Sequence, residues 1–82
     1  MQINQKIKLT IEADAGQRLI SRISNVLLRP NLDILHFQFE KIEEHSSLFE
    51  IILNVSNDDF NRIVLQMEKQ VDVKKVSYKE SK

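Results

Sequence analysis

The 82-residue chain has no cysteine, which excludes disulfide frameworks, thiolate zinc sites and cysteine nucleophiles. Its single glycine, Gly16, is too little for a glycine-rich phosphate loop. An overall positive field is also missing, because 12 basic residues balance 12 acidic ones. No apolar run approaches the roughly 18 residues that a membrane helix needs, and residues 1–10 lack the apolar core of a signal peptide. We therefore expect a cytoplasmic protein without a membrane partner.

What the chain does contain is typical of one small globular domain. Hydrophobic residues make up 41% of the sequence and charged residues 29%, which is an ordinary balance. A second core does not fit into this length, and no linker or low-complexity stretch divides the chain. We expect a single domain over residues 1–82, and a core this small gains stability from a partner or a second copy.

The first half of the chain changes from a strand pattern to a helix pattern. Apolar residues alternate with polar ones over residues 7–11, which predicts a strand with one buried face. Asp14 and Gln17 then have the spacing of a capping box, and apolar residues three and four apart over 19–27 give a helix one apolar face. Pro30 disfavours helical geometry in the residue before it, so the helix should end by that residue.

The second half predicts a hairpin, a helix and a last strand. Two β-rich stretches, Asp33–Ile42 and Leu48–Val55, flank the polar patch EEHSS and predict the hairpin. The sequence SNDD caps a second helix, whose apolar stripe is Phe60, Ile63, Val64 and Met67. Residues 71–78 return as a strand. The order βαββαβ predicts an α+β, ferredoxin-like sandwich, in which a four-stranded antiparallel sheet carries two helices on one face.

No group of side chains predicts catalysis or a metal site. His36 and His45 are the only histidines, and no HxH or HExxH ligand spacing occurs. Ser46 and Ser47 adjoin His45, but neighbours in a turn rarely converge on one point as a nucleophile and its base must. The acidic residues form no visible pair in an apolar cleft, where their pKa values would be split. We expect neither an enzyme nor a metal site in this chain alone.

The same element order occurs in RNA-recognition modules, which stack bases on aromatic residues of the central strands. Here the strand aromatics Phe37, Phe39 and Phe49 fit the buried face instead, and the first strand has no aromatic residue. We therefore expect no nucleic-acid partner and keep RNA binding as a third hypothesis.

Three stretches resemble motifs of one known family. ISRI at Ile20–Ile23 matches the family's LSRV in the first helix, and RPNLDI at Arg29–Ile34 stands where the family has RRGYNI. QMEKQVDV at Gln66–Val73 is similar to QLxKLxDV, which joins the second helix to the last strand. The family is the small regulatory subunit of acetolactate synthase (acetohydroxyacid synthase), which is built on an ACT domain. The resemblance covers nearly the whole chain, which looks like the short, single-ACT type.

The resemblance implies a regulatory subunit and no enzymatic activity of its own. Such subunits bind the thiamine-diphosphate-dependent catalytic subunit, raise its activity, and in many members let a branched-chain amino acid inhibit the complex. The thiamine diphosphate belongs to the partner, so no cofactor is expected in this chain. The expected function is therefore an activating small subunit in branched-chain amino-acid biosynthesis. The alternative is a stand-alone ACT-like sensor that binds a small molecule, such as an amino acid, for another enzyme.

The family's amino-acid site lies at a dimer interface, between the first strand–helix loop and the corner before the second strand. The resemblance assigns to it the loop residues Asp14, Ala15, Gly16, Gln17 and Arg18 and the corner residues Asn31 and Asp33. Two loop positions depart from the family, because Ala15 replaces an asparagine and Arg18 replaces a glycine. We therefore expect a weak response to valine, or none.

The predicted topology leaves the second strand at a sheet edge. This strand is long, has no proline and carries Leu35, Phe37 and Phe39, so it would invite aggregation if it stayed unpaired. Pairing with a twin gives a continuous two-fold sheet, as in ACT domains of this family. We expect a homodimer.

Overall fold

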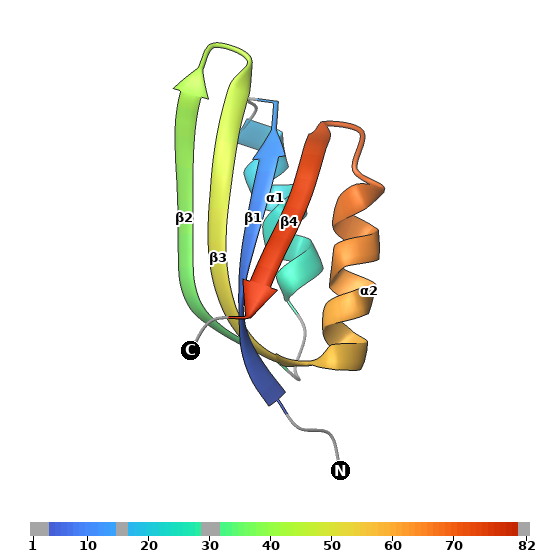
Figure 1. Cartoon of the computed structure of the whole chain (residues 1–82). Helices are drawn as coiled ribbons and strands as arrows, with labels where there is room; N and C mark the ends of the chain where they lie inside the picture. Colours follow the sequence, from blue (N-terminus) through green and yellow to red (C-terminus); the bar gives the residue numbers. More distant parts are fainter. Residues whose placement is uncertain (1–3, 15–16, 29–31, 81–82) are drawn as a thin grey trace.

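Four antiparallel strands form one sheet in the computed structural model, which describes residues 4–14, 17–28 and 32–80. The strands are β1 (Asn4–Ala13), β2 (Asp33–Glu43), β3 (Ser46–Ser56) and β4 (Val73–Glu80). Their order across the sheet is β2-β3-β1-β4, so that the two long central strands, β1 and β3, lie side by side (Figure 1). The register places Leu9 opposite Ile51 and Ile11 opposite Phe49. The β2 strand therefore lies at one edge of the sheet, as the sequence predicts.

Two helices, α1 (Gln17–Leu27) and α2 (Asn57–Glu68), cover one face of the sheet (Figure 1). The buried residues are four apart in α1 and three and four apart in α2, so each helix buries one stripe. The buried apolar residues form one core: Ile7, Leu9, Ile11, Ala13, Leu19, Ile23, Leu27, Phe49, Ile51, Leu53, Val55, Phe60, Ile63 and Met67. Full burial of a valine, leucine, isoleucine, methionine or phenylalanine side chain contributes about 1.5–3 kcal/mol to the free energy of unfolding. This core holds the α+β, ferredoxin-like βαββαβ fold that the sequence predicts.

The start of α2 is fixed by its own cap. Ser56 is extended, with φ −73° and ψ 157°, and its hydroxyl accepts a hydrogen bond from the backbone N–H of Asp59 at 3.3 Å. Asp58 and Asp59 lie in the first helical turn, where negative charge is favoured by the helix dipole. Both features are those expected from the SNDD sequence.

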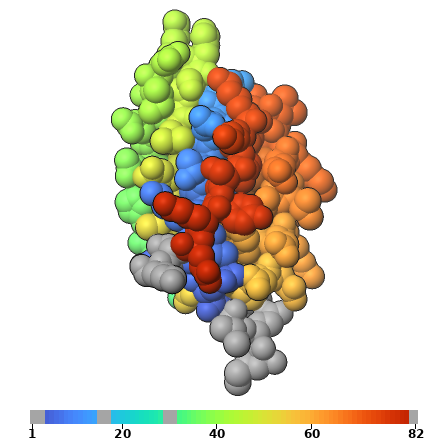
Figure 2. All heavy atoms as spheres, viewed as in Figure 1, coloured from blue at the N-terminus to red at the C-terminus, as the bar shows by residue number. Residues whose placement is uncertain are grey.

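The other face of the sheet carries no helix (Figure 2). The register places polar residues of β1 and β4 on it, among them Lys8, Thr10, Ser77 and Lys79. This face is therefore exposed to solvent, in keeping with the alternation of apolar and polar residues in the sequence. Neither of the helices within the described residues is long and apolar enough to cross a membrane.

Two element boundaries differ from the sequence-based prediction. The hairpin turn is shorter than the polar patch suggests, because β2 continues to Glu43 and β3 begins at Ser46. The last strand starts later than predicted, since Val71 lies in a turn with 93% of its surface exposed and β4 begins at Val73. Backbone hydrogen bonds from Gln70 to Met67 and from Val73 to Gln70 form this turn. The second bond closes a turn over residues 70–73 that contains Val71, so the strand begins only at Val73.

Candidate effector site

The loop half of the candidate site begins at Asp14, directly after β1. The backbone N–H of Asp14 donates to the carbonyl of Asp72 at 2.9 Å, and its own carbonyl accepts from the Ser47 hydroxyl at 2.9 Å. Lys74 Nζ lies 3.4 Å from the Asp14 carboxylate and donates to the carbonyl of His45 at 3.0 Å. Asp14 thus joins three connections at one end of the sheet: the first loop, the β2–β3 turn and the α2–β4 turn.

Two arginines lie on the same face of α1, one turn apart. Arg18 is exposed, and Arg22 forms a 2.9 Å ion pair with Asp72, in which both side chains are nearly half exposed. Exposed pairs of this kind contribute at most about 1 kcal/mol. Arg18 forms no ion pair with another described residue.

The corner half of the site lies at the opposite end of the sheet. Asp33 pairs with Asn54, which in turn pairs with Lys6 near the start of β1. Asp14 comes eight residues after Lys6, which corresponds to roughly 27 Å of strand at about 3.4 Å per residue. One chain therefore does not bring Asp33 together with Asp14 and Arg18.

Of the other residues assigned to this site, Gln17 is the first residue of α1. Ala15, Gly16 and Asn31 lie outside the described residues.

The three predicted edge residues of β2 do not share one orientation. Phe37 and Phe39 point to the helix-covered face, where their rings meet Phe49 edge-on at centroid distances of 6.0 and 5.0 Å. Leu35 is the extra residue of a bulge between Ile34 and His36, and its exposed fraction is 54%. The strict alternation that groups Leu35 with Phe37 and Phe39 is therefore broken. Ile34 takes the place opposite the buried Leu53.

The residues weighed as catalytic or metal-binding have other surroundings. The buried Ser47 hydroxyl donates to the backbone carbonyl of Asp14, which holds the first loop. His36 contacts Gln38 on β2 at 3.3 Å, and His45 lies in the hairpin turn. Within the described residues no group of three or more His, Cys, Asp or Glu side chains is placed to hold a metal. Every buried polar side chain described there has a hydrogen-bond partner.

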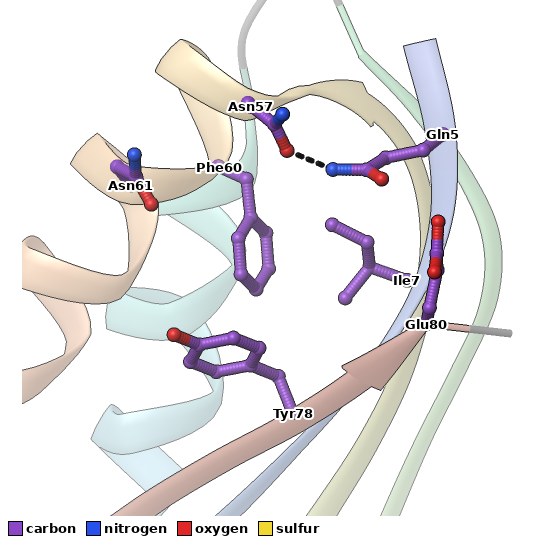
Figure 3. A pocket seen from close by; sticks show the side chains of 7 residues that line it. All are labelled: Gln5, Ile7, Asn57, Phe60, Asn61, Tyr78 and Glu80. Carbon is purple, nitrogen blue, oxygen red and sulfur yellow. Dashed lines mark hydrogen bonds between the residues drawn. The ribbon is translucent and has the colours of Figure 1, made fainter.

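Sequence reasoning missed a hollow at the far end of the helix-covered face, between the start of β1, the start of α2 and the end of β4. Figure 3 shows its lining residues: Gln5, Ile7, Asn57, Phe60, Asn61, Tyr78 and Glu80. The rings of Phe60 and Tyr78 meet edge-on with a centroid distance of 4.8 Å, and Gln5 Nε2 donates a hydrogen bond to Oδ1 of the Asn57 side chain. The pairing of β1 with β4 and the packing of α2 beside them bring these distant residues together, so no local motif marks the site.

The arrangement of the elements is that of an ACT domain. The ACT domain of a GTP pyrophosphokinase from Chlorobium tepidum superposes with a TM-score of 0.80 and 13% identity, over 93% of this chain and 99% of that one. An uncharacterised protein from Thermotoga maritima gives 0.79 and 18%, over 96% and 99%. The C-terminal domain of the MgtC protein from Mycobacterium tuberculosis gives 0.72 and 12%, over 95% and 88%. These likenesses establish the fold that the chain shares with them.

No family model matches the sequence, and no curated protein matches it.

Proposed function

We propose that this chain is a non-catalytic regulatory subunit that binds and activates the catalytic subunit of acetolactate synthase. The observation that carries the proposal is the stretch Gln66–Val73, which resembles the family's QLxKLxDV. It spans the end of α2, the α2–β4 turn and the first residue of β4, which is the junction that this motif forms in the family. The ACT-like fold and the ISRI stretch within α1 support the same assignment.

The proposed active form is a homodimer paired through β2. Between its bulges this strand has a regular stretch, His36–Lys41, whose outer edge can accept another strand. Exposed apolar side chains lie at both ends of β2, namely Ile34, Leu35 and Ile42. Two copies related by a two-fold axis would bury this surface and continue the sheet.

Such a dimer would also complete the effector site. Two β2 strands related by this axis would run antiparallel. The end of one copy that carries Asp14 and Arg18 would then lie beside the end of the other copy that carries Asp33. Asp33 would then accept from the ammonium group of an amino acid, and Arg18 would fill space that glycine leaves open in the family. The proposed response to valine is weak for this reason.

The experiment is co-purification from the cells that make this protein. A tagged chain should retain a large thiamine-diphosphate-dependent enzyme, and a Gln66→Ala, Asp72→Ala variant should retain less of it. The matched control is Asp58→Ala, Asn61→Ala at the start of α2, at the other end of the helix from the α2–β4 turn. Retention of a different enzyme, with no acetolactate synthase, would favour the alternative of an ACT-like sensor for that enzyme.

A further inference from the structure

We propose that the hollow in Figure 3 binds a small organic cation, a short aliphatic amine without a carboxylate group. This site is separate from the effector site and goes beyond the proposed function. It lies beside β4, at the opposite edge of the sheet from β2. Pairing of two chains through β2 would therefore leave it open.

The floor of the hollow is apolar and partly aromatic. Ile7 and Phe60 are buried, with 4% and 3% of their surfaces exposed, and the half-exposed Tyr78 ring lies against Phe60. Figure 3 shows the Tyr78 ring below Phe60 and Ile7, with Gln5 and Asn57 above them and Glu80 to the right. Aromatic rings of this kind attract cations through their negative faces. An alkyl group would cover the apolar floor at the same time.

The polar groups around the opening favour a cation over an anion. Glu80 is the only charged residue among the described residues that line the hollow, and it forms no ion pair with any of the other described residues. The side-chain nitrogen of Gln5 donates to the side chain of Asn57. The side-chain oxygen of Gln5 is therefore left as an acceptor beside Glu80 (Figure 3). A carboxylate and an amide oxygen together suit a protonated amine.

A zwitterion such as valine fits this hollow poorly. The part of the lining that the structure describes contains no lysine or arginine for a carboxylate. The positive N-terminal end of α2 is already capped by Ser56 and compensated by the negative charges of Asp58 and Asp59. The carboxylate of a bound zwitterion would therefore be repelled by the negative charge of Glu80. The cavity volume of about 310 Å³ is at the small end of the range of ligand sites, so the amine should be short.

Nuclear magnetic resonance on the 15N-labelled full chain tests the site at constant ionic strength and pH 7. Isobutylammonium should give saturable shifts of the side-chain amides of Gln5, Asn57 and Asn61, with a midpoint in the millimolar range. Isobutanol has the same shape without the charge, and valine adds a carboxylate. Each should bind at least about tenfold more weakly, the change that accompanies loss of one charge-assisted contact.

Two variants with a matched control decide the outcome. Glu80→Gln should weaken isobutylammonium binding about tenfold, and Tyr78→Leu should weaken it about threefold to tenfold. Glu44→Gln makes the same charge change in the β2–β3 turn, at an exposed residue, and should leave binding unchanged. Glu80 is exposed, so its variant will fold even if Tyr78→Leu does not. The proposal is overturned if isobutylammonium gives no saturable shifts, if isobutanol or valine binds equally well, or if Glu80→Gln binds as the wild type does. None of these results bears on the activation of acetolactate synthase.

Discussion

Replacing Phe49 tests how the edge strand is held against the sheet. Phe49 is fully buried, and the rings of Phe37 and Phe39 meet it edge-on at 6.0 and 5.0 Å. Phe49→Ala removes the ring and leaves a cavity, which costs about 3–5 kcal/mol. Phe49→Leu keeps most of the apolar burial and loses two ring pairs, each worth about 0.5–1.5 kcal/mol. We therefore expect Phe49→Leu to cost about 1–3 kcal/mol.

The assay is urea unfolding followed by circular dichroism, at one fixed protein concentration because the stability of a dimer depends on concentration. At about 0.05–0.15 kcal/mol per residue, a domain of this length has a free energy of unfolding of about 4–12 kcal/mol. The leucine variant should therefore remain folded. The alanine variant should lose much of its stability, with an unfolding midpoint far below that of the wild type.

A double-mutant cycle isolates the ring contact from the general effect of core substitution. Phe39→Leu and Phe49→Leu should be non-additive by about 0.5–1.5 kcal/mol. Leu35→Ala combined with Phe49→Leu is the control, because Leu35 lies in the bulge four residues from Phe39, and these two changes should add. A coupling energy of zero between Phe39 and Phe49 would refute the inward orientation of the edge-strand aromatics.

Three further predictions concern the dimer, the effector and the helix cap. Sedimentation should show a homodimer at micromolar concentration, and Leu35→Lys should shift it towards monomer; a wild-type monomer would contradict the pairing through β2. Calorimetric titration should find a Kd for valine, leucine or isoleucine in the millimolar range or weaker. One lost hydrogen bond costs about 0.5–1.5 kcal/mol, and each 1.4 kcal/mol changes the Kd about tenfold. Ala15→Asn with Arg18→Gly should strengthen that binding, and tight binding by the wild type would contradict the prediction. Ser56→Ala should lower the free energy of unfolding by about 1 kcal/mol, and no change in the urea midpoint would show that the cap is unimportant.

The order of the elements was predictable because apolar residues recur in each element with the spacing typical of a strand or of a helix. Alternation in β1 and the three-and-four spacing in α1 and α2 depend on residues close together in sequence. The SNDD cap is local in the same way, since Ser56 reaches only as far as Asp59. These features need no knowledge of the rest of the chain.

What the sequence did not reveal depends on contacts between distant segments. The bulge at Leu35 is a property of how β2 meets β3, and alternation alone places that residue on the wrong face. Val71 looks like a strand residue, but hydrogen bonds at the end of α2 keep it in a turn. The hollow combines Gln5 with Tyr78, whose proximity follows from the pairing of β1 with β4. The pairings of β1 and β2 with β3 place Asp14 and Asp33 at opposite ends of the sheet, so the proposed effector site would be complete only with a second copy.

The most direct test of the regulatory assignment is the rate of acetolactate formation by the cognate catalytic subunit as this chain is added. The account predicts that the rate rises and saturates, that the chain alone forms no acetolactate, and that serum albumin at the same concentration has no such effect. An unchanged rate at a saturating concentration of the chain would contradict the assignment to acetolactate synthase.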